Sequence, residues 1–141
     1  MPRVIIVGAS VGGSIAADTL RDLGVEVVLL ERDLNYIKPC GGAVPPQLLR
    51  DFDVPESLLV AHIDTARIIS PKSRRVDIPV GDGFVGMVAR DVFDEWLRTR
   101  AANAGAERRT GTFTQFTRGE DGVAVIRREL REPAGRSPAA A

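Results

Sequence analysis

Several features that many proteins depend on are scarce in this chain. Cys40 is its only cysteine, which excludes an internal disulfide and fits a reducing compartment. Nineteen basic residues are balanced by nineteen acidic ones, so the chain lacks the basic excess typical of nucleic-acid binders. No apolar run approaches the roughly 20 residues that span a bilayer, and no signal peptide precedes the first strand-like run. These absences predict a cytoplasmic protein with no nucleic-acid partner.

The length and composition of the chain permit one domain with a modest core. The chain has 141 residues, of which 44% are hydrophobic, and this is too few residues for two domains. The last residues, REPAGRSPAAA, are mostly small residues and prolines with little that could pack. The sequence therefore predicts one domain over residues 1–128 and a disordered tail over 129–141.

The first 31 residues follow a strand-helix-strand pattern. RVIIV and VEVVLLE are short apolar runs typical of parallel strands buried on both faces. Between them, a stripe of positions falls at helical spacing, and Gly24 supplies the end of the helix. The stripe consists of Ile15, Ala16, Thr19, Leu20 and Leu23. This alternation predicts a βαβ crossover, a parallel sheet and an α/β fold that begins like a Rossmann domain.

The remainder of the chain predicts additional antiparallel strands, short helices and a β-hairpin. Residues 33–60 are irregular, with a short helix that Pro46 can begin. Three strands, ARIISP, RRVDIPV and FVGMV, are separated by PKS and GDG turns. A stronger helix is predicted from Asp91, its cap, to about Ala104, with Val92 and Trp96 on its packed face. TGTFTQFTRGEDGVAVIRREL alternates around a GEDG turn and predicts the hairpin.

The segment VGASVGG lies where a phosphate-binding turn is expected, between a strand and a helix. Gly8 allows a tight exit from the strand, and Gly13 allows the helix to pack close to the sheet. The helix N-terminus then presents N–H groups to a diphosphate. Glu31 lies at about the spacing at which an acid accepts hydrogen bonds from the adenosine ribose, and an acid there disfavours a 2′-phosphate. The pattern predicts FAD or NAD rather than NADP.

Ser10 departs from the G-x-G-x-x-G pattern, whose middle glycine lets the backbone touch the diphosphate. Serine is the mildest replacement, because its hydroxyl can itself bond a phosphate oxygen. The alternative is a tight β-to-α turn that binds no ligand. The strand, the helix and Glu31 together favour the nucleotide site.

The stretch KPCGGAVPP places the single thiol among prolines and next to two glycines. It is either a loop that happens to contain a cysteine or a backbone that a flat, reactive group approaches closely. Free cysteines are usually buried and inert. A packing role for Cys40 therefore stays open beside a chemical one.

Three segments carry a resemblance to a known family: ERDLNYIKPCGGAVPPQLLRDFDVPESLL, ISPKSRRVDI and GMVARDVFDEWLRTRAANAGA. Together they resemble the N-terminal part of geranylgeranyl reductases, flavoproteins of the group built like aromatic-ring hydroxylases. The similarity runs from Met1 to about Val125. It implies a FAD-dependent, NADPH-consuming enzyme that saturates double bonds of a geranylgeranyl chain, with residues 1–128 as a truncated FAD-binding domain.

The resemblance also implies which residues contact the cofactor. Cys40, Gly41 and Gly42 match the P-C-G-G segment beside the flavin ring, and Arg90 matches an arginine that contacts the cofactor. Cys40 is the one candidate catalytic residue, and no metal site is predicted. The predicted cofactor-binding residues are Gly8, Ser10, Gly12, Gly13, Glu31, Arg32, Cys40, Gly41, Gly42 and Arg90.

Other candidates for the chemistry are weaker. Reduction of an alkene by a flavin hydride needs a proton source as well. His62 is a lone histidine that is better explained as a surface residue, and Arg74 and Arg75 lie in a polar turn where solvation explains them. Tyr36 precedes the cysteine loop and could hydrogen-bond near the cofactor. An isoprenoid substrate suggests peripheral contact with a membrane, although no amphipathic helix supports it.

The chain is several times shorter than the enzymes it resembles, and the later segments that complete their FAD site do not occur in it. We therefore expect a fragment that is inactive by itself and leaves sheet edges uncovered. Two alternatives remain. One is a flavin-dependent hydroxylase or halogenase of the same fold, and the other is a truncated nucleotide-binding module without catalysis.

Overall fold

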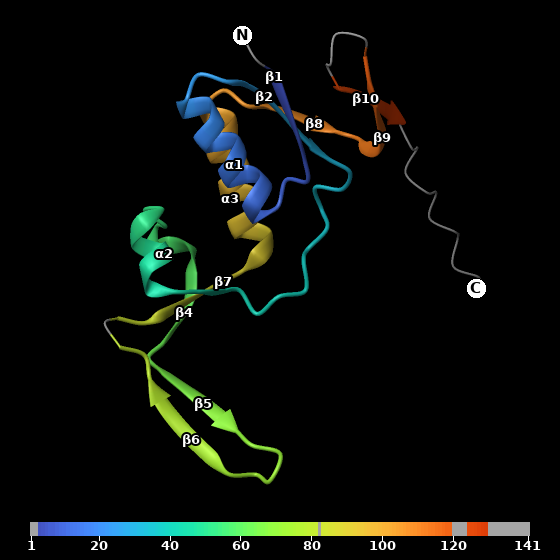
Figure 1. Ribbon diagram of the computed structural model, residues 1–141. Coiled ribbons are helices and arrows are strands. Elements are labelled where there is room, and N and C mark those ends of the chain that lie inside the picture. The colour runs from blue at the N-terminus through green and yellow to red at the C-terminus, as the bar shows by residue number, and fades with distance from the viewer. Residues whose placement is uncertain (1–2, 82, 120–123, 130–141) are drawn as a thin grey trace, which may run out of the picture. The chain divides into compact units, whose positions relative to one another are not determined.

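The computed structural model describes residues 3–81, 83–119 and 124–129. The chain divides into two compact units: unit 1 is Met1–Asn35 with Leu97–Ala141, and unit 2 is Tyr36–Trp96. Parallel and antiparallel strands occur together with helices (Figure 1). The predicted α/β class, with a βαβ start, extra antiparallel strands and a hairpin, is confirmed.

Unit 1 is built on a parallel sheet of three strands in the order β1-β2-β8. The first two strands and the helix between them form the predicted βαβ crossover, with Arg3 of β1 opposite Glu26 of β2. Gly24, at φ 77°, lies in the turn that ends the helix. The elements are β1 (Arg3–Val7), α1 (Val11–Asp22), β2 (Glu26–Glu31) and β8 (Glu107–Thr110).

Small residues form the face of α1 that packs on the sheet. Ser14 and Ala17 are fully buried, whereas Ala16 and Thr19 of the predicted apolar stripe are exposed. The reason is the close approach of helix and sheet. A Cβ atom on Gly13 would collide with the backbone of the preceding turn, so there is no room for a larger side chain at the start of this face, whereas Leu20 near the end of the helix packs against the core.

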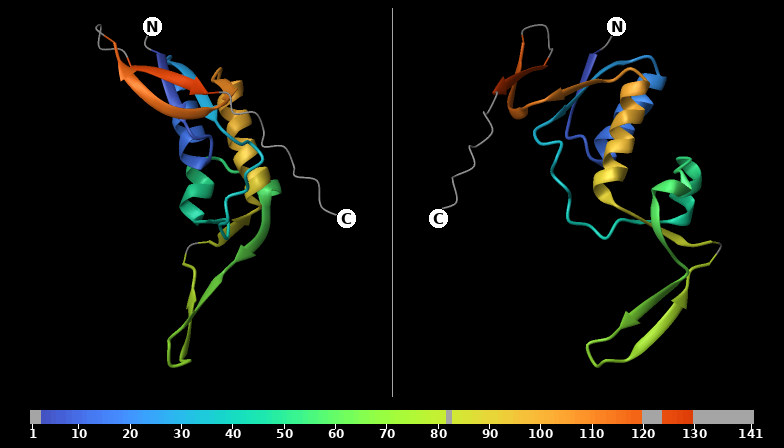
Figure 2. Two further views of the ribbon diagram at one scale, coloured as in Figure 1. Left: turned by 90° about the vertical axis from the view of Figure 1, so that its right-hand side faces the viewer. Right: turned by 180° about the vertical axis from the view of Figure 1, so that it is seen from behind.

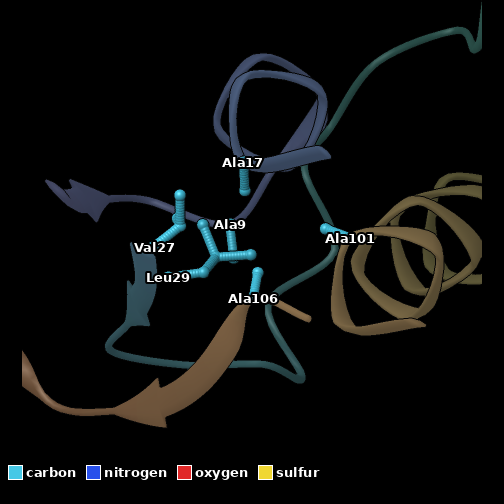
Figure 3. Close-up of a cluster of buried hydrophobic side chains, with 6 residues drawn as sticks. All are labelled: Ala9, Ala17, Val27, Leu29, Ala101 and Ala106. Carbon is cyan, nitrogen blue, oxygen red and sulfur yellow. The ribbon is translucent and has the colours of Figure 1, made fainter. Parts of the chain in front are cut away.

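The core of unit 1 lies between β2 and the helices. Val27 and Leu29 of β2 pack with three alanines (Figure 3). These are Ala17 of α1, Ala101 of α3 (Arg90–Asn103) and Ala106, the residue before β8. The second half of α3 lies beside α1 (Figures 1 and 2), and the Arg100 Nε atom is 2.7 Å from Asp18 Oδ2. The core residues are Ala9, Ala17, Val27, Leu29, Ala101 and Ala106.

The predicted burial of the first strand on both faces is wrong. Ile5 is 39% exposed and Val7 is 51% exposed, while residues 27–30 of β2 are all buried. Within the described residues β1 pairs with β2 alone. The central strand β2 is therefore buried on both faces, whereas β1 is partly exposed to solvent.

The third strand of the parallel sheet, β8, was not predicted. Its sequence, ERRT, has neither an apolar run nor an alternating pattern. It is held by backbone pairing, from Val28 opposite Glu107 to Glu31 opposite Thr110. Such a strand cannot be recognised from its own sequence, because only its pairing with β2 identifies it.

The long helix α3 was predicted, with errors in its details. It begins at Arg90, so Asp91 lies inside its first turn rather than at the cap. Val92 is 54% exposed, and Trp96 is only partly buried, with its ring stacked on Phe93 at a centroid distance of 5.9 Å. Two charged residues, Asp94 and Arg98, lie on the buried face instead, because each is paired with polar atoms there.

The predicted hairpin of unit 1 is confirmed by the antiparallel pairing of β9 (Thr112–Arg118) with β10 (Ala124–Glu129). Three residues of the predicted GEDG turn, 120–122, lie outside the described residues, as do 130–141 of the predicted disordered tail. The single domain over 1–128 and the tail stay predictions.

Unit 2 contains two antiparallel sheets and a short helix. The first sheet has the order β3-β7-β4, and the second is the ribbon β5-β6 (Figure 1). Pro46 begins the short helix as predicted, and the three predicted strands are confirmed, whereas the strands 43–44 and 59–63 were missed. The elements are β3 (Ala43–Val44), α2 (Pro46–Asp51), the 3-10 helix η1 (Glu56–Leu58), β4 (Leu59–Ile63), β5 (Thr65–Ile69), β6 (Arg75–Pro79) and β7 (Val85–Val88).

Candidate functional site

The turn between β1 and α1 requires glycine at two positions. Gly8 has φ 101°, a conformation that favours glycine, and its N–H donates to the Leu30 carbonyl at 2.8 Å. A Cβ atom on Gly13 would collide with the Gly8 carbonyl oxygen. The tight turn after β1 and the close approach of α1 to this turn are therefore both confirmed.

The other two predicted residues of the turn lie at the start of α1. Ser10 is the N-cap residue, with extended backbone. A Cβ atom on Gly12 would meet no atom within 4 Å, so packing does not require glycine there. The first turn of α1 contains no acidic residue, so its positive dipole end is not neutralised by a carboxylate of that turn.

Glu31, at the end of β2, bends back to the glycine turn. Its Oε2 atom accepts a hydrogen bond from the Ala9 N–H at 2.8 Å. Its Oε1 atom accepts from the backbone N–H groups of Arg32 at 2.8 Å and Asp33 at 3.2 Å. The Arg32 side chain itself is exposed. The carboxylate thus connects the ends of two neighbouring parallel strands, where open α/β sheets bind their ligands.

A small cavity of about 150 Å³ lies beside Glu31 in unit 1. It is smaller than the 300–1,000 Å³ of typical ligand sites. Its lining includes residues of β2 and of β8, and Ala9 of the glycine turn. Its lining residues are Ala9, Leu29, Glu31, Leu34, Arg108, Arg109 and Thr110.

Sequence reasoning missed two polar side chains that reach this turn. Ser14 and Arg98 are both buried, and both donate to the Ala9 carbonyl oxygen, from Oγ at 3.1 Å and from Nη1 at 3.3 Å. No motif marks either residue. Arg98 is remote in sequence and comes to the turn only through the packing of α3.

The cysteine loop belongs to unit 2 and runs along β7. Gly42 has φ 71°, and a Cβ atom on it would collide with the Val88 carbonyl oxygen. The Gly42 carbonyl accepts from the Val88 N–H at 2.9 Å. Gly41 has open space at its Cβ position. One glycine is therefore needed for packing against the strand, and the other leaves the loop surface accessible.

The Cys40 thiol is exposed, so it does not fill a core position. The backbone N–H of Gly42, and then the Arg90 guanidinium, lower the pKa of the thiol below its usual value, because both stabilise the thiolate. Of the charged neighbours, Lys38 contributes least to this lowering. The arrangement favours a reactive thiol rather than an inert one.

Arg90 is held in place by Asp94, one turn along α3. The two side chains form two parallel hydrogen bonds of 2.9 Å, between Nε and Oδ1 and between Nη2 and Oδ2. They are 10% and 8% exposed. This pairing, and then the hydrogen bond with Cys40, raise the pKa of Arg90, so it stays a cation beside the thiol. Unit 2 thus brings together Cys40, Gly42 and Arg90. That these residues contact a cofactor stays a prediction.

The weaker candidates lie at exposed positions. Tyr36 is 62% exposed. The His62 ring lies 4.1 Å from that of Phe84, and its Nε2 atom is 3.9 Å from the Glu56 carboxylate. Arg74 and Arg75 are exposed at the start of β6. Among the residues that the structure describes, no cluster of three His, Cys, Asp or Glu could hold a metal ion.

Several curated proteins are similar in sequence to this chain. No family model matches the chain. The geranylgeranyl diphosphate reductase of Rhodobacter capsulatus is 53% identical over 124 residues, which are 88% of this chain and 32% of that protein. The chain belongs to the geranylgeranyl reductase family. The chloroplastic geranylgeranyl diphosphate reductase of Oryza sativa subsp. japonica is 42% identical, with 81% of this chain and 25% of the relative covered.

An archaeal member of the geranylgeranyl reductase family is similar too. The digeranylgeranylglycerophospholipid reductase 2 of Methanopyrus kandleri is 34% identical over 74% of this chain and 26% of its own length. The chain spans about a quarter to a third of the length of these curated relatives.

Solved structures agree on the fold. A geranylgeranyl bacteriochlorophyll reductase-like protein from Thermoplasma acidophilum has a TM-score of 0.74 at 24% identity, over 85% of this chain and 33% of that one. The halogenase PltM, solved in complex with phloroglucinol and FAD, has a TM-score of 0.69 at 19% identity, over 94% of this chain and 32% of that one. At these identities the likeness concerns the fold alone.

Proposed function

We propose that this chain provides the FAD-binding part of a flavin-dependent geranylgeranyl reductase. Such an enzyme saturates isolated double bonds of a geranylgeranyl chain, carried on a diphosphate or on chlorophyll, and consumes NADPH. The observation that carries the proposal is the 53% identity with a geranylgeranyl diphosphate reductase over 88% of the chain. The local geometry of each unit supports it.

Unit 1 fits the ADP half of FAD. The tight turn at Gly8 and the close approach at Gly13 are the backbone features that a dinucleotide site needs. The first turn of α1 would bind the diphosphate through its N–H groups, as helix N-termini do. Glu31 would accept hydrogen bonds from the ribose, since its Oε2 atom has a second lone pair beyond the one that Ala9 uses.

Unit 2 fits the flavin end of the cofactor. Gly41 leaves the loop surface free of a side chain, and Gly42 lets the loop pack closely against β7. A flat ring needs such an uncovered surface for close approach. Arg90 supplies a fixed cation there, because Asp94 holds it through two hydrogen bonds. Cys40 lies beside Arg90 and can exchange a proton, and its pKa is lowered from its usual value by the Gly42 N–H and the Arg90 guanidinium.

The residues of this chain would orient the reactants and supply a proton. The bound flavin, once NADPH has reduced it, would provide the hydride that adds to one carbon of the double bond. We assign Cys40 as the acid that protonates the other carbon, after which the thiolate regains a proton from water. The Gly42 N–H and the Arg90 guanidinium support this role, since they stabilise the thiolate that the transfer leaves behind.

The two alternative functions have less support. A flavin-dependent halogenase or hydroxylase rests on fold likeness alone, at 18–21% identity for the brominase Bmp2 and the halogenase PltM. A nucleotide-binding module without catalysis would bind FAD and reduce no alkene. Alkene reduction by this chain when it is completed with the remaining part of a relative would exclude that module.

The isoprenoid substrate favours a cytoplasmic protein that visits a membrane surface at its periphery. Within the described residues no helix is long and apolar enough to cross a bilayer. Sedimentation with lipid vesicles that contain geranylgeranyl diphosphate would test the contact.

The proposal is tested first by cofactor binding. FAD is titrated with the purified chain while flavin fluorescence anisotropy is recorded, and ADP is added as a competitor. We expect saturable binding that ADP reverses. Anisotropy that does not change with protein concentration would contradict the FAD site.

Catalysis is tested in a chimera that joins this chain to the remaining part of the Rhodobacter capsulatus reductase, because the chain matches only 32% of that protein. The chimera is supplied with geranylgeranyl diphosphate, FAD and NADPH, and the products are analysed by mass spectrometry. Cys40→Ser should keep the FAD affinity and slow alkene reduction by about 10²-fold or more, the typical contribution of a general acid. The matched control is Ser73→Ala in the exposed β5–β6 turn, which should change neither quantity. A Cys40→Ser variant of full activity would remove the assignment of Cys40.

A further inference from the structure

Both peptide groups of Ala9, in the turn between β1 and α1, are held by side chains from three elements. The Ala9 N–H donates to Glu31 Oε2 of β2 at 2.8 Å. The Ala9 carbonyl oxygen accepts from Ser14 Oγ of α1 at 3.1 Å and from Arg98 Nη1 of α3 at 3.3 Å. All of these residues belong to unit 1.

Arg98 is an unusual residue in this arrangement because it is buried. It is 6% exposed, although arginine almost always stays at the surface unless its charge is paired or hydrogen-bonded. Its neighbour Arg100, on the same helix, has a side chain that is 39% exposed. A buried guanidinium that reaches a loop carbonyl 89 residues away in sequence fixes that loop more firmly than a surface contact could.

The bonded carbonyl determines the direction of the chain as it enters α1. A trans peptide carries its C=O and N–H on opposite sides of a rigid plane, so holding the Ala9 carbonyl also fixes the N–H of Ser10. Ser10 is the N-cap, and its own carbonyl accepts the Ser14 N–H at 2.9 Å. The orientation of the first turn of α1 therefore depends on the donors to Ala9.

We infer that Arg98 is a positioning residue of the diphosphate-binding turn, and that it acts through the Ala9 carbonyl oxygen. The inference rests on the proposed function, since it assumes that the turn binds the diphosphate. The guanidinium and the Ser14 hydroxyl share one acceptor. Loss of either donor leaves the peptide free to rotate, and the N–H groups that face the anion lose their alignment.

The test measures ADP affinity by NMR titration of the full chain, at a temperature where far-UV circular dichroism shows every variant to be folded. Arg98→Met removes the donors and keeps the length of the side chain. We expect it to weaken ADP binding by about tenfold or more, and Arg98→Lys to recover part of the loss. Arg100→Met is the matched control, because Arg100 pairs with Asp18 in the second half of α1, and it should bind ADP like the wild type.

Ser14→Ala supplies a second and independent measurement. Because Ser14 and Arg98 act on one oxygen, the double variant should lose less affinity than the sum of the single losses. Adenosine, which lacks the diphosphate, should bind Arg98→Met and wild type alike. A residue that only stabilised the fold would leave the ADP affinity of the folded variants unchanged.

Each outcome decides the inference. If Arg98→Met binds ADP as tightly as Arg100→Met does, Arg98 has no positioning role. Should Arg98→Met not fold, Ser14→Ala carries the test, because the inference requires both donors, and wild-type affinity in that variant overturns the inference. If the wild-type chain does not bind ADP, the proposed function is contradicted as well. If the wild type binds ADP and the Arg98 and Ser14 variants bind it equally well, only the inference is contradicted.

Discussion

At the scale of single residues, two neighbouring glycines at the start of α1 differ in what they do. A Cβ atom on Gly13 would collide with a carbonyl oxygen of the turn, whereas one on Gly12 would meet no atom within 4 Å. Packing thus requires glycine at position 13 but not at position 12. The glycine pattern alone does not distinguish them.

Substitution of these glycines should therefore have opposite effects on stability. Gly13→Ala should lower the free energy of unfolding by about 1–3 kcal/mol through overpacking and abolish binding of ADP. Gly12→Ala should raise it by about 0.5–1 kcal/mol, because alanine favours a helix over glycine. Urea denaturation followed by circular dichroism measures both. Equal destabilisation by the two variants would show that α1 does not approach the turn as closely as described.

The titration of Cys40 is the second property of a single residue that can be tested. Because its pKa is lowered, the thiolate forms at lower pH than in a free cysteine, and alkylation by iodoacetamide should reach half its maximal rate at lower pH. Arg90→Gln should move that midpoint upward, and Lys38→Gln should move it less, since Lys38 contributes least. As the chain has one cysteine, mass spectrometry follows the reaction directly. An unchanged midpoint in Arg90→Gln would remove Arg90 as a cause.

At the scale of elements, α3 shows how buried charge is accommodated. Its pattern predicted an apolar face, and the structure places Asp94 and Arg98 on that face together with Phe93 and Leu97. The carboxylate is buried because Arg90 supplies two hydrogen bonds. Periodicity detects the helix, but it cannot anticipate that a charged residue has a partner.

Two Asp–Arg ion pairs that differ in burial allow the effect of burial on stability to be measured. Asp94 pairs with Arg90 at 8% and 10% side-chain exposure, and Asp77 pairs with Arg67 across the β5–β6 ribbon at 47% and 58%. Asp94→Ala should lower the free energy of unfolding by about 3–5 kcal/mol, because it removes the carboxylate that neutralises a nearly buried cation. Asp77→Ala should cost no more than about 1 kcal/mol. Similar melting temperatures for the two variants would contradict the burial of the pair on α3.

At the scale of the whole molecule, packing is unevenly distributed. Unit 1 has a core of buried side chains around β2, whereas every residue of β5 and β6 is exposed. Large apolar side chains are exposed on that ribbon, among them Ile68, Ile69, Val76 and Ile78. Elements with few buried contacts open more readily than a core does.

Limited proteolysis with trypsin should report this contrast. Among the described residues, we expect the first cuts after Lys72, Arg74 and Arg75, which are exposed in and beside the ribbon turn. Arg98 is buried in α3 and should resist. Peptide masses over a time course identify the order. Cleavage after Arg98 before any cut in the ribbon would show that the helix is less stable than the ribbon.

The sequence by itself determined the βαβ crossover, the glycine turn, the hairpin and the family. Each of these follows from neighbouring residues, since strand and helix periods, positive-φ glycines and a loop such as KPCGG are local patterns. Only the tertiary structure decided that Arg98 holds the Ala9 carbonyl, that Glu31 bends back onto the turn, and that ERRT is a strand. These facts depend on contacts between residues far apart in the chain, and local periodicity carries no information about them.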